Sequence, residues 1–204
     1  MGICGHMLVF WKEKLVFLAV PKTGTTAIEG ALAPRADAVF RDPPILKHTP
    51  FYRYKRWVLP MLEKAGAEDF ETVAVVRHPV DWLSSWYRYR LRNELVGHKN
   101  STRGISFDEF IVEYCNESPA PFANVGSQAK FLAAQNKPSP CTHVYRYEAQ
   151  PKLISFLEER LSTQITLKQL NVSPTADISV DPEVMALLTR EKASDFALWE
   201  SAQN

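Results

Sequence analysis

Short apolar runs alternate with longer stretches of mixed polarity along this chain. Four runs predict β-strands, at 7–11, 15–20, 72–76 and 142–146, and a short fifth strand is expected at 39–40. The run at 72–76 is apolar almost throughout, which is typical of a strand buried on both faces of a parallel sheet. The first two runs flank a charged turn at 12–14, so we expect them to neighbour each other.

The segments between the strands carry helical periodicity or helix start signals. They predict helices at 26–32, 51–65, 80–96, 107–115, 126–134, 151–161 and 183–199. We expect Pro34 to end the first helix and Pro60 to kink or divide the second. This alternation predicts one α/β domain over 1–204, with a central, mostly parallel sheet and helices on both faces. Ligands of such sheets bind beyond the carboxyl ends of the strands.

Composition narrows the class of protein. The chain has 204 residues, 46% of them hydrophobic, and a net charge of +1, so it can bury a sizeable core and has no overall charge that favours nucleic acid or membranes. The apolar runs near the N-terminus are too short for a membrane span. Cys4, Cys115 and Cys141 lack the spacing of a metal site or disulfide framework. We therefore expect a soluble, cytoplasmic protein that needs no metal.

The most informative segment is 15–32, where an apolar strand runs through a short loop into a helix. The loop offers Lys22 as a cation, Gly24 for a close turn, and Thr25 and Thr26 as hydroxyl donors. Main-chain N–H groups at the start of a helix have no intrahelical partner, and the helix dipole adds positive charge there. The segment therefore predicts a cradle for a phosphate or sulfate group. Lys22 precedes the glycine, unlike the lysine of the usual nucleotide triphosphatase loop.

A second candidate anion site follows the strand at 72–76. Arg77 comes directly after this strand, and Ser85 lies eight positions later on the predicted helix. An arginine fork can bind phosphate through two hydrogen bonds, and a serine hydroxyl can donate a third. Ser84 is an adjacent alternative donor.

The motif Pro21-Lys22-Thr23-Gly24-Thr25-Thr26 resembles the 5′-phosphosulfate loop of the sulfotransferases. The resemblance implies a P-loop-NTPase-like sulfotransferase fold and 3′-phosphoadenosine 5′-phosphosulfate as the donor. It also implies that Arg77 and Ser85 hold the 3′-phosphate and that Tyr147, in the segment 144–148, lies near the adenosine. The residues expected to bind the donor are Lys22, Thr23, Gly24, Thr25, Thr26, Ala27, Arg77, Ser85 and Tyr147.

Two further segments resemble the polysaccharide branch of this family, of which the chain would be a soluble, bacterial member. They are Gln128–Leu132 and the segment 170–173. The chain lacks the Arg-Lys-Gly segment with which the cytosolic small-molecule branch contacts the 3′-phosphate. Adenosine contacts beyond Arg77, Ser85 and Tyr147 therefore stay unassigned.

The activity that follows is metal-independent, in-line transfer of a sulfuryl group to a hydroxyl or amine of a small-molecule or glycan acceptor. Lys22 is expected to neutralise charge on the leaving oxygen, and His48 is the candidate base that takes the acceptor's proton. His78 is less suitable because it adjoins Arg77, and Glu63 and Asp42 are alternative bases. The remaining histidines, His6, His98 and His143, are expected at surface or packing positions.

The acceptor cannot be named from the sequence. Two groups of cationic and aromatic residues, at 52–57 and 88–92, could bind an acidic glycan or could be solvated helix faces. Two other functions stay open: a nucleotide or small-molecule kinase with an unusual loop, and a binding protein that holds the nucleotide without turnover. The kinase is disfavoured because the central strand ends in Arg77 rather than in an acidic residue that could hold Mg²⁺.

Overall fold

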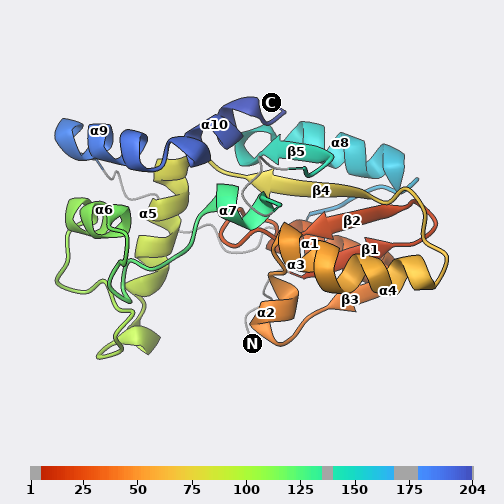
Figure 1. Ribbon diagram of the computed structural model, residues 1–204, viewed down its shortest axis with the longest axis horizontal. Coiled ribbons are helices and arrows are strands. Elements are labelled where there is room, and N and C mark those ends of the chain that lie inside the picture. Colours follow the sequence, from red (N-terminus) through yellow and green to blue (C-terminus); the bar gives the residue numbers. More distant parts are fainter. Residues whose placement is uncertain (1–5, 135–139, 168–178, 204) are drawn as a thin grey trace.

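The computed structural model describes residues 6–134, 140–167 and 179–203, and shows a five-stranded sheet in the order β3-β1-β2-β4-β5 (Figure 1). The pairs β2–β4 and β4–β5 are parallel, whereas β1 is antiparallel to both β2 and β3. The sheet is therefore mixed rather than mostly parallel. The cause is the tight turn between β1 and β2, where Lys14 N–H donates to the carbonyl of Trp11 at 3.2 Å and forces a hairpin. The strands are β1 (Met7–Phe10), β2 (Leu15–Leu18), β3 (Ala38–Phe40), β4 (Glu71–Val76) and β5 (His143–Arg146).

Helices cover both faces of the sheet, as the alternation predicts. The helices of the described residues are α1 (Thr26–Leu32), α2 (Pro44–Lys47), α3 (Phe51–Arg53), α4 (Leu59–Lys64), α5 (Pro79–Arg90), α6 (Phe107–Cys115), α7 (Gln128–Leu132), α8 (Gln150–Arg160), α9 (Pro182–Glu191) and α10 (Ala193–Ser201). Three single 3₁₀ turns accompany them, at Ala33–Arg35, Asn93–Leu95 and Tyr147–Ala149.

Alternate residues of the strands feed two separate cores. On one face Leu8, Phe17 and Val75 pack with side chains of α1 and α8. On the other face Val9 and Val76 pack with side chains of the segment 51–64, of α7 and of α10. Both faces of the central strands are thus buried, which explains why their sequences read as continuous apolar runs.

A third core lies beyond the sheet, where α5, α6 and α9 pack together at the left of Figure 1. Trp82, Phe110 and Leu188 are buried there. Helix α6 begins where predicted because Ser106 and Glu109 form a reciprocal capping box. The carboxyl ends of β2 and β4 point toward this helical cluster (Figure 1), so the loops that follow both strands meet α5.

Two predicted helices need correction, and a third is divided as predicted. The helix expected at 80–96 ends at Arg90, and the one expected at 183–199 is interrupted at Lys192, which has φ −121° and ψ 30°. The helix expected at 51–65 is divided, as predicted, by a π-helical turn at Tyr54–Val58 that ends two residues before Pro60. Pro60 has no N–H to donate, and its ring displaces the preceding turn. The main-chain hydrogen bonds there therefore span five residues, as in a π-helix, instead of four.

The segment 170–173, whose sequence resembles the polysaccharide branch, lies outside the described residues, as does Cys4. Cys115 and Cys141 form no disulfide within the described part of the chain. No helix among those residues is both long and apolar enough to cross a membrane.

Candidate functional site

The loop between β2 and α1 is tightly wound. Lys22 and Gly24 both have left-handed backbones, with φ of 66° and 69°. A lysine rarely adopts this conformation, which costs about 1–2 kcal/mol. The loop is held from both sides: the Thr23 hydroxyl donates to the carbonyl of Val20 at 2.8 Å, and Trp82 Nε1 of α5 donates to the carbonyl of Pro21 at 2.8 Å.

These contacts qualify the predicted role of Thr23. Its side chain is buried, and its hydroxyl already donates to Val20, so only its main chain is available to an anion. Thr25 is also buried and immediately precedes α1, whereas Thr26 and Ala27 form the partly exposed first turn of that helix. Thr25 makes no side-chain capping bond to α1.

The Lys22 ammonium lies against aromatic rings of α5. Its nitrogen is 4.3 Å from the ring centroid of Tyr89 and 5.6 Å from that of Trp86. Cation–π attraction of this kind is worth about 0.5–1 kcal/mol at exposed sites. The contact directs the lysine toward the helix that also carries Ser85.

Tyr147 joins the loop to Arg77. A Cβ atom built on Gly24 would lie 2.3 Å from Cε2 of Tyr147, so the ring rests directly on this glycine. The Arg77 guanidinium carbon is 4.7 Å from the centroid of the same ring. Gly24 is therefore required both by its backbone angle and by the aromatic ring that covers it.

The main chain of Arg77 is fixed by Gln128, a residue whose role the sequence did not reveal. Arg77 N–H donates to Gln128 Oε1 at 2.9 Å, and Gln128 Nε2 donates back to the Arg77 carbonyl at 2.8 Å. The Gln128 side-chain amide thus makes the pair of hydrogen bonds to Arg77 that the main chain of a neighbouring strand would make. It is 1% exposed and opens helix α7.

Helix α7 is in turn held by α10. Asp195 accepts hydrogen bonds from the Ala129 N–H at 2.7 Å and from the Ser127 hydroxyl at 3.0 Å. Burial raises the pKa of this carboxyl, although its hydrogen bonds oppose the shift. Glu148 adds a second link, because it accepts from the His78 N–H at 3.2 Å and from Trp199 Nε1 at 3.1 Å. The C-terminal helix therefore supports the segment that carries Arg77.

Helix α5 begins two residues after Arg77 and carries Ser84, Ser85 and Arg88. Both serines are buried. The Nε atoms of Arg77 and Arg88 are buried too, and no acceptor among the described residues reaches either one. Burial lowers the pKa of Arg88, and the positive charge of Arg77 lowers it further, so the two guanidinium groups lie close enough to repel each other.

His48 lies at the base of the loop, where its Nδ1 is 2.9 Å from the carbonyl of Ala19. A carbonyl can only accept, so Nδ1 carries the proton and Nε2 of the neutral ring keeps its lone pair. Burial lowers the pKa of His48, and the bond to Ala19 offsets part of the shift. A neutral ring with a free Nε2 lone pair can act as a base near pH 7.

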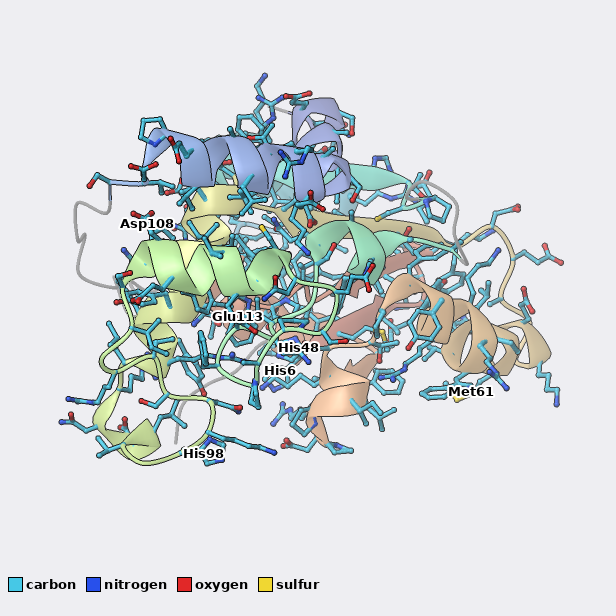
Figure 2. The ribbon with its side chains drawn as sticks, turned by 60° about the vertical axis from the view of Figure 1, so that its left-hand side comes forward. His6, His48, Met61, His98, Asp108 and Glu113 are labelled. Atoms are coloured by element: carbon cyan, nitrogen blue, oxygen red, sulfur yellow. The ribbon has the colours of Figure 1, made fainter. Side chains whose placement is uncertain are left out.

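Three other ionisable groups act on His48, and the adjacent Lys47 is the first of them. His6 and Glu29 also act on His48 electrostatically, and Figure 2 shows His6 beside His48 in the middle of the molecule. Glu29 projects from α1, is fully buried, and accepts a hydrogen bond from the His6 N–H. Oε1 of Glu29 has no partner among the described residues. No local sequence pattern marks Glu29, because it occupies an ordinary helix position.

The other candidate bases stand apart from this arrangement. The His78 ring packs on Phe196 and Trp199 with centroid distances of 5.7 and 4.8 Å, which is a packing role. His143 packs on Phe156 at 4.6 Å, and Asp42 and Glu63 are exposed.

The two cationic groups do not form uniform surfaces. Arg90 is buried and donates to the carbonyls of Pro121 and Asn124 at 2.7 and 3.0 Å, so it is a structural residue rather than a ligand contact. Arg92 rests on Tyr89 with a guanidinium-to-centroid distance of 4.8 Å. At 52–57, Tyr54 belongs to the core, while Tyr52 and Trp57 are exposed around Arg53.

A shallow crevice beside Tyr147, lined by Thr23, Gly24, Val75 and Arg146, leaves no room for a molecule as small as water. It is therefore not a formed ligand pocket. A nucleotide base would therefore need Tyr147 to move off Gly24, or would bind on the outer face of its ring.

A larger, open hollow of about 510 Å³ lies along α6 but is acidic. Asp108 and Glu113, labelled in Figure 2, line it with Glu109. These carboxylates already serve the fold: Glu109 caps α6, and Glu113 accepts from the Ala120 N–H at 2.6 Å. Their charge disfavours an anion there, so the loop and Arg77 remain the candidate site.

The structure thus joins the loop to Arg77 through Tyr147 and packs the loop against α5, the helix that carries Ser85. It also places His48 at the base of the loop. Among the described residues, no group of three or more histidine, cysteine or acidic side chains could hold a metal ion. No known family model matches the sequence, and no curated protein matches it closely enough to count as a relative.

Proposed function

We propose that the protein transfers a sulfuryl group from 3′-phosphoadenosine 5′-phosphosulfate to a hydroxyl or amine of a small-molecule or glycan acceptor. The observation that carries the proposal is the contact chain from Gly24 through Tyr147 to Arg77. Two segments that each suggest an anion site are more than fifty residues apart in the sequence, yet one aromatic ring touches both. This is the arrangement expected for a ligand with an aromatic base between two anionic groups.

Each residue has a distinct role in this proposal. The loop at 22–26 holds the 5′-phosphosulfate, and Arg77 and Ser85 hold the 3′-phosphate. Tyr147 stacks against the adenosine. The support of Arg77 by Gln128 fixes the arginine before the nucleotide arrives, so little ordering is needed on binding.

The reaction would be an in-line displacement at sulfur. The acceptor oxygen forms a bond to sulfur while the bond from sulfur to the bridging phosphate oxygen breaks, and negative charge grows on that oxygen. Lys22 stabilises this charge. His48 Nε2 takes the proton that the acceptor hydroxyl loses, because Nδ1 is occupied by Ala19.

The experiment that tests the proposal measures product formation from donor labelled in its sulfuryl group, with mixed carbohydrate and phenol acceptors, and nucleotide binding in parallel. Lys22→Ala is expected to reduce turnover by at least about 100-fold while adenosine 3′,5′-bisphosphate still binds, since removing one stabilising group of this kind costs about 10²–10³ in rate. Lys12→Ala is the matched control, because Lys12 is an exposed lysine in the preceding turn.

The outcomes separate the three functions. Binding without turnover in the wild-type protein would indicate a nucleotide-binding protein. Turnover of a nucleoside triphosphate, dependent on added Mg²⁺, would indicate the kinase. Equal turnover by wild type and Lys22→Ala would contradict the assigned role of the lysine.

A further inference from the structure

We propose that Arg88 is a second guanidinium ligand of the anion bound at Arg77, so that this site is built for a doubly charged phosphate monoester. The inference rests on the proposed function, because it identifies a further residue at the site assigned to the 3′-phosphate.

The first observation is a pair of unsatisfied donors. Nε of Arg77 and Nε of Arg88 are each buried, and neither meets an acceptor among the described residues. A buried N–H that bonds to nothing is costly, and native proteins contain few of them. Two on neighbouring cationic groups indicate a shared acceptor that is not part of the described protein chain.

The second observation is that the two charges are alike. Burial lowers the pKa of Arg88, and the positive charge of the Arg77 guanidinium lowers it further. Asp81 is the carboxylate that opposes this effect at Arg88, but no ion pair between the two is formed within the described residues. Like charges held together in a partly buried position are stabilised when an anion lies between them.

Helix spacing directs these groups to one place. Ser84 and Ser85 precede Arg88 by four and three residues, so all three lie on one face of α5. Arg77 lies two residues before the helix begins. Arg90 and Arg92, by contrast, have protein contacts of their own, and they do not belong to this face.

The ligand class follows from the donor set. Two guanidinium forks and one or two hydroxyls can serve the three terminal oxygens of a phosphate monoester, which carries nearly two charges at pH 7. A phosphodiester or a sulfate ester has a single charge and gains less from a second arginine. The site should therefore discriminate in favour of a terminal phosphate.

Calorimetric titration with adenosine 3′,5′-bisphosphate and with adenosine 5′-monophosphate tests the inference on wild type, Arg88→Gln and Arg88→Lys. Arg88→Gln is expected to weaken binding of the bisphosphate by about 10- to 100-fold and to leave the monophosphate unchanged. Arg88→Lys should restore only part of the loss, because lysine lacks the planar fork. Arg92→Gln is the control and should bind like wild type, because Arg92 lies two residues beyond the end of α5 and rests on Tyr89.

Thermal unfolding without nucleotide separates a binding role from a structural one. Removing Arg88 relieves its repulsion with Arg77, so Arg88→Gln should melt no lower than wild type. A lower melting temperature with a proportional loss for both nucleotides would show a structural residue and overturn the inference. If Arg77→Gln weakens bisphosphate binding and Arg88→Gln does not, Arg88 is not a ligand and the proposed function stands. If the wild type does not bind the bisphosphate, both proposals fail.

Discussion

Gln128 provides the sharpest test of how the site is held. Replacing it with leucine keeps most of the side-chain volume but removes both hydrogen bonds to the Arg77 main chain, at 2.9 and 2.8 Å. Each main-chain group left without a partner costs about 1–3 kcal/mol when buried, and Arg77 is only partly buried. We therefore expect a loss of about 2–4 kcal/mol in the free energy of unfolding.

The same change should weaken nucleotide binding. When Gln128 no longer fixes the strand end, Arg77 must be ordered as the ligand binds, and even 1.4 kcal/mol of that cost is a tenfold rise in Kd. Guanidinium-induced unfolding measures the stability and calorimetry measures the affinity for adenosine 3′,5′-bisphosphate. Gln128→Glu keeps the acceptor but buries a carboxylate whose second oxygen faces the Arg77 carbonyl, so it should be at least as destabilising as Gln128→Leu.

Lys130→Ala is the matched control, since Lys130 is exposed on the same short helix. If Gln128→Leu unfolds and binds like this control, the reasoning about the strand end is refuted.

The remaining predictions concern His48 and Gly24. The His48 imidazole should titrate below pH 6.5 in nuclear magnetic resonance spectra, because burial lowers its pKa. The neutral ring should keep its proton on Nδ1, because the Ala19 carbonyl accepts from that nitrogen. Below pH 6.5 the unfolded state binds more protons at His48 than the folded state does, so the free energy of unfolding should decrease as the pH falls through 6.5. A titration at or above 6.5 would contradict this environment. Gly24→Ala should destabilise the protein by about 1–3 kcal/mol because of its positive φ and its contact with Tyr147, and Tyr147→Ala in the same chain should recover only the part due to the contact. Equal stability of Gly24→Ala and wild type in a thermal melt would show that the ring does not rest on the glycine.

The fold was largely predictable because its signals are local. The apolar run at 72–76 and the capping box at Ser106 and Glu109 each specify an element from neighbouring residues alone. The break at Lys192 and the end of α5 at Arg90 carry no comparable local signal. The sheet is mixed because the short turn at 12–14 makes β1 and β2 antiparallel. The expectation of a mostly parallel sheet did not take this turn into account.

The candidate site was predictable only in part. Lys22, Gly24, Arg77 and Ser85 stand in recognisable local patterns, so the sequence could single them out. Gln128 and Glu29 contact residues that are distant in the sequence, so their positions are known only once the chain is folded. Arg88, which we propose as a further ligand, lies three residues after Ser85 on α5.

We infer that the loop at 22–26 and the Arg77–Ser85 site bind opposite ends of one nucleotide. A crystal structure of the protein with adenosine 3′,5′-bisphosphate would show whether they do. We expect the 5′-phosphate on the loop beside Lys22, the 3′-phosphate within hydrogen-bond distance of Arg77 and Ser85, and the adenosine against Tyr147. A nucleotide bound elsewhere, or held by only one of the two sites, would rule this inference out.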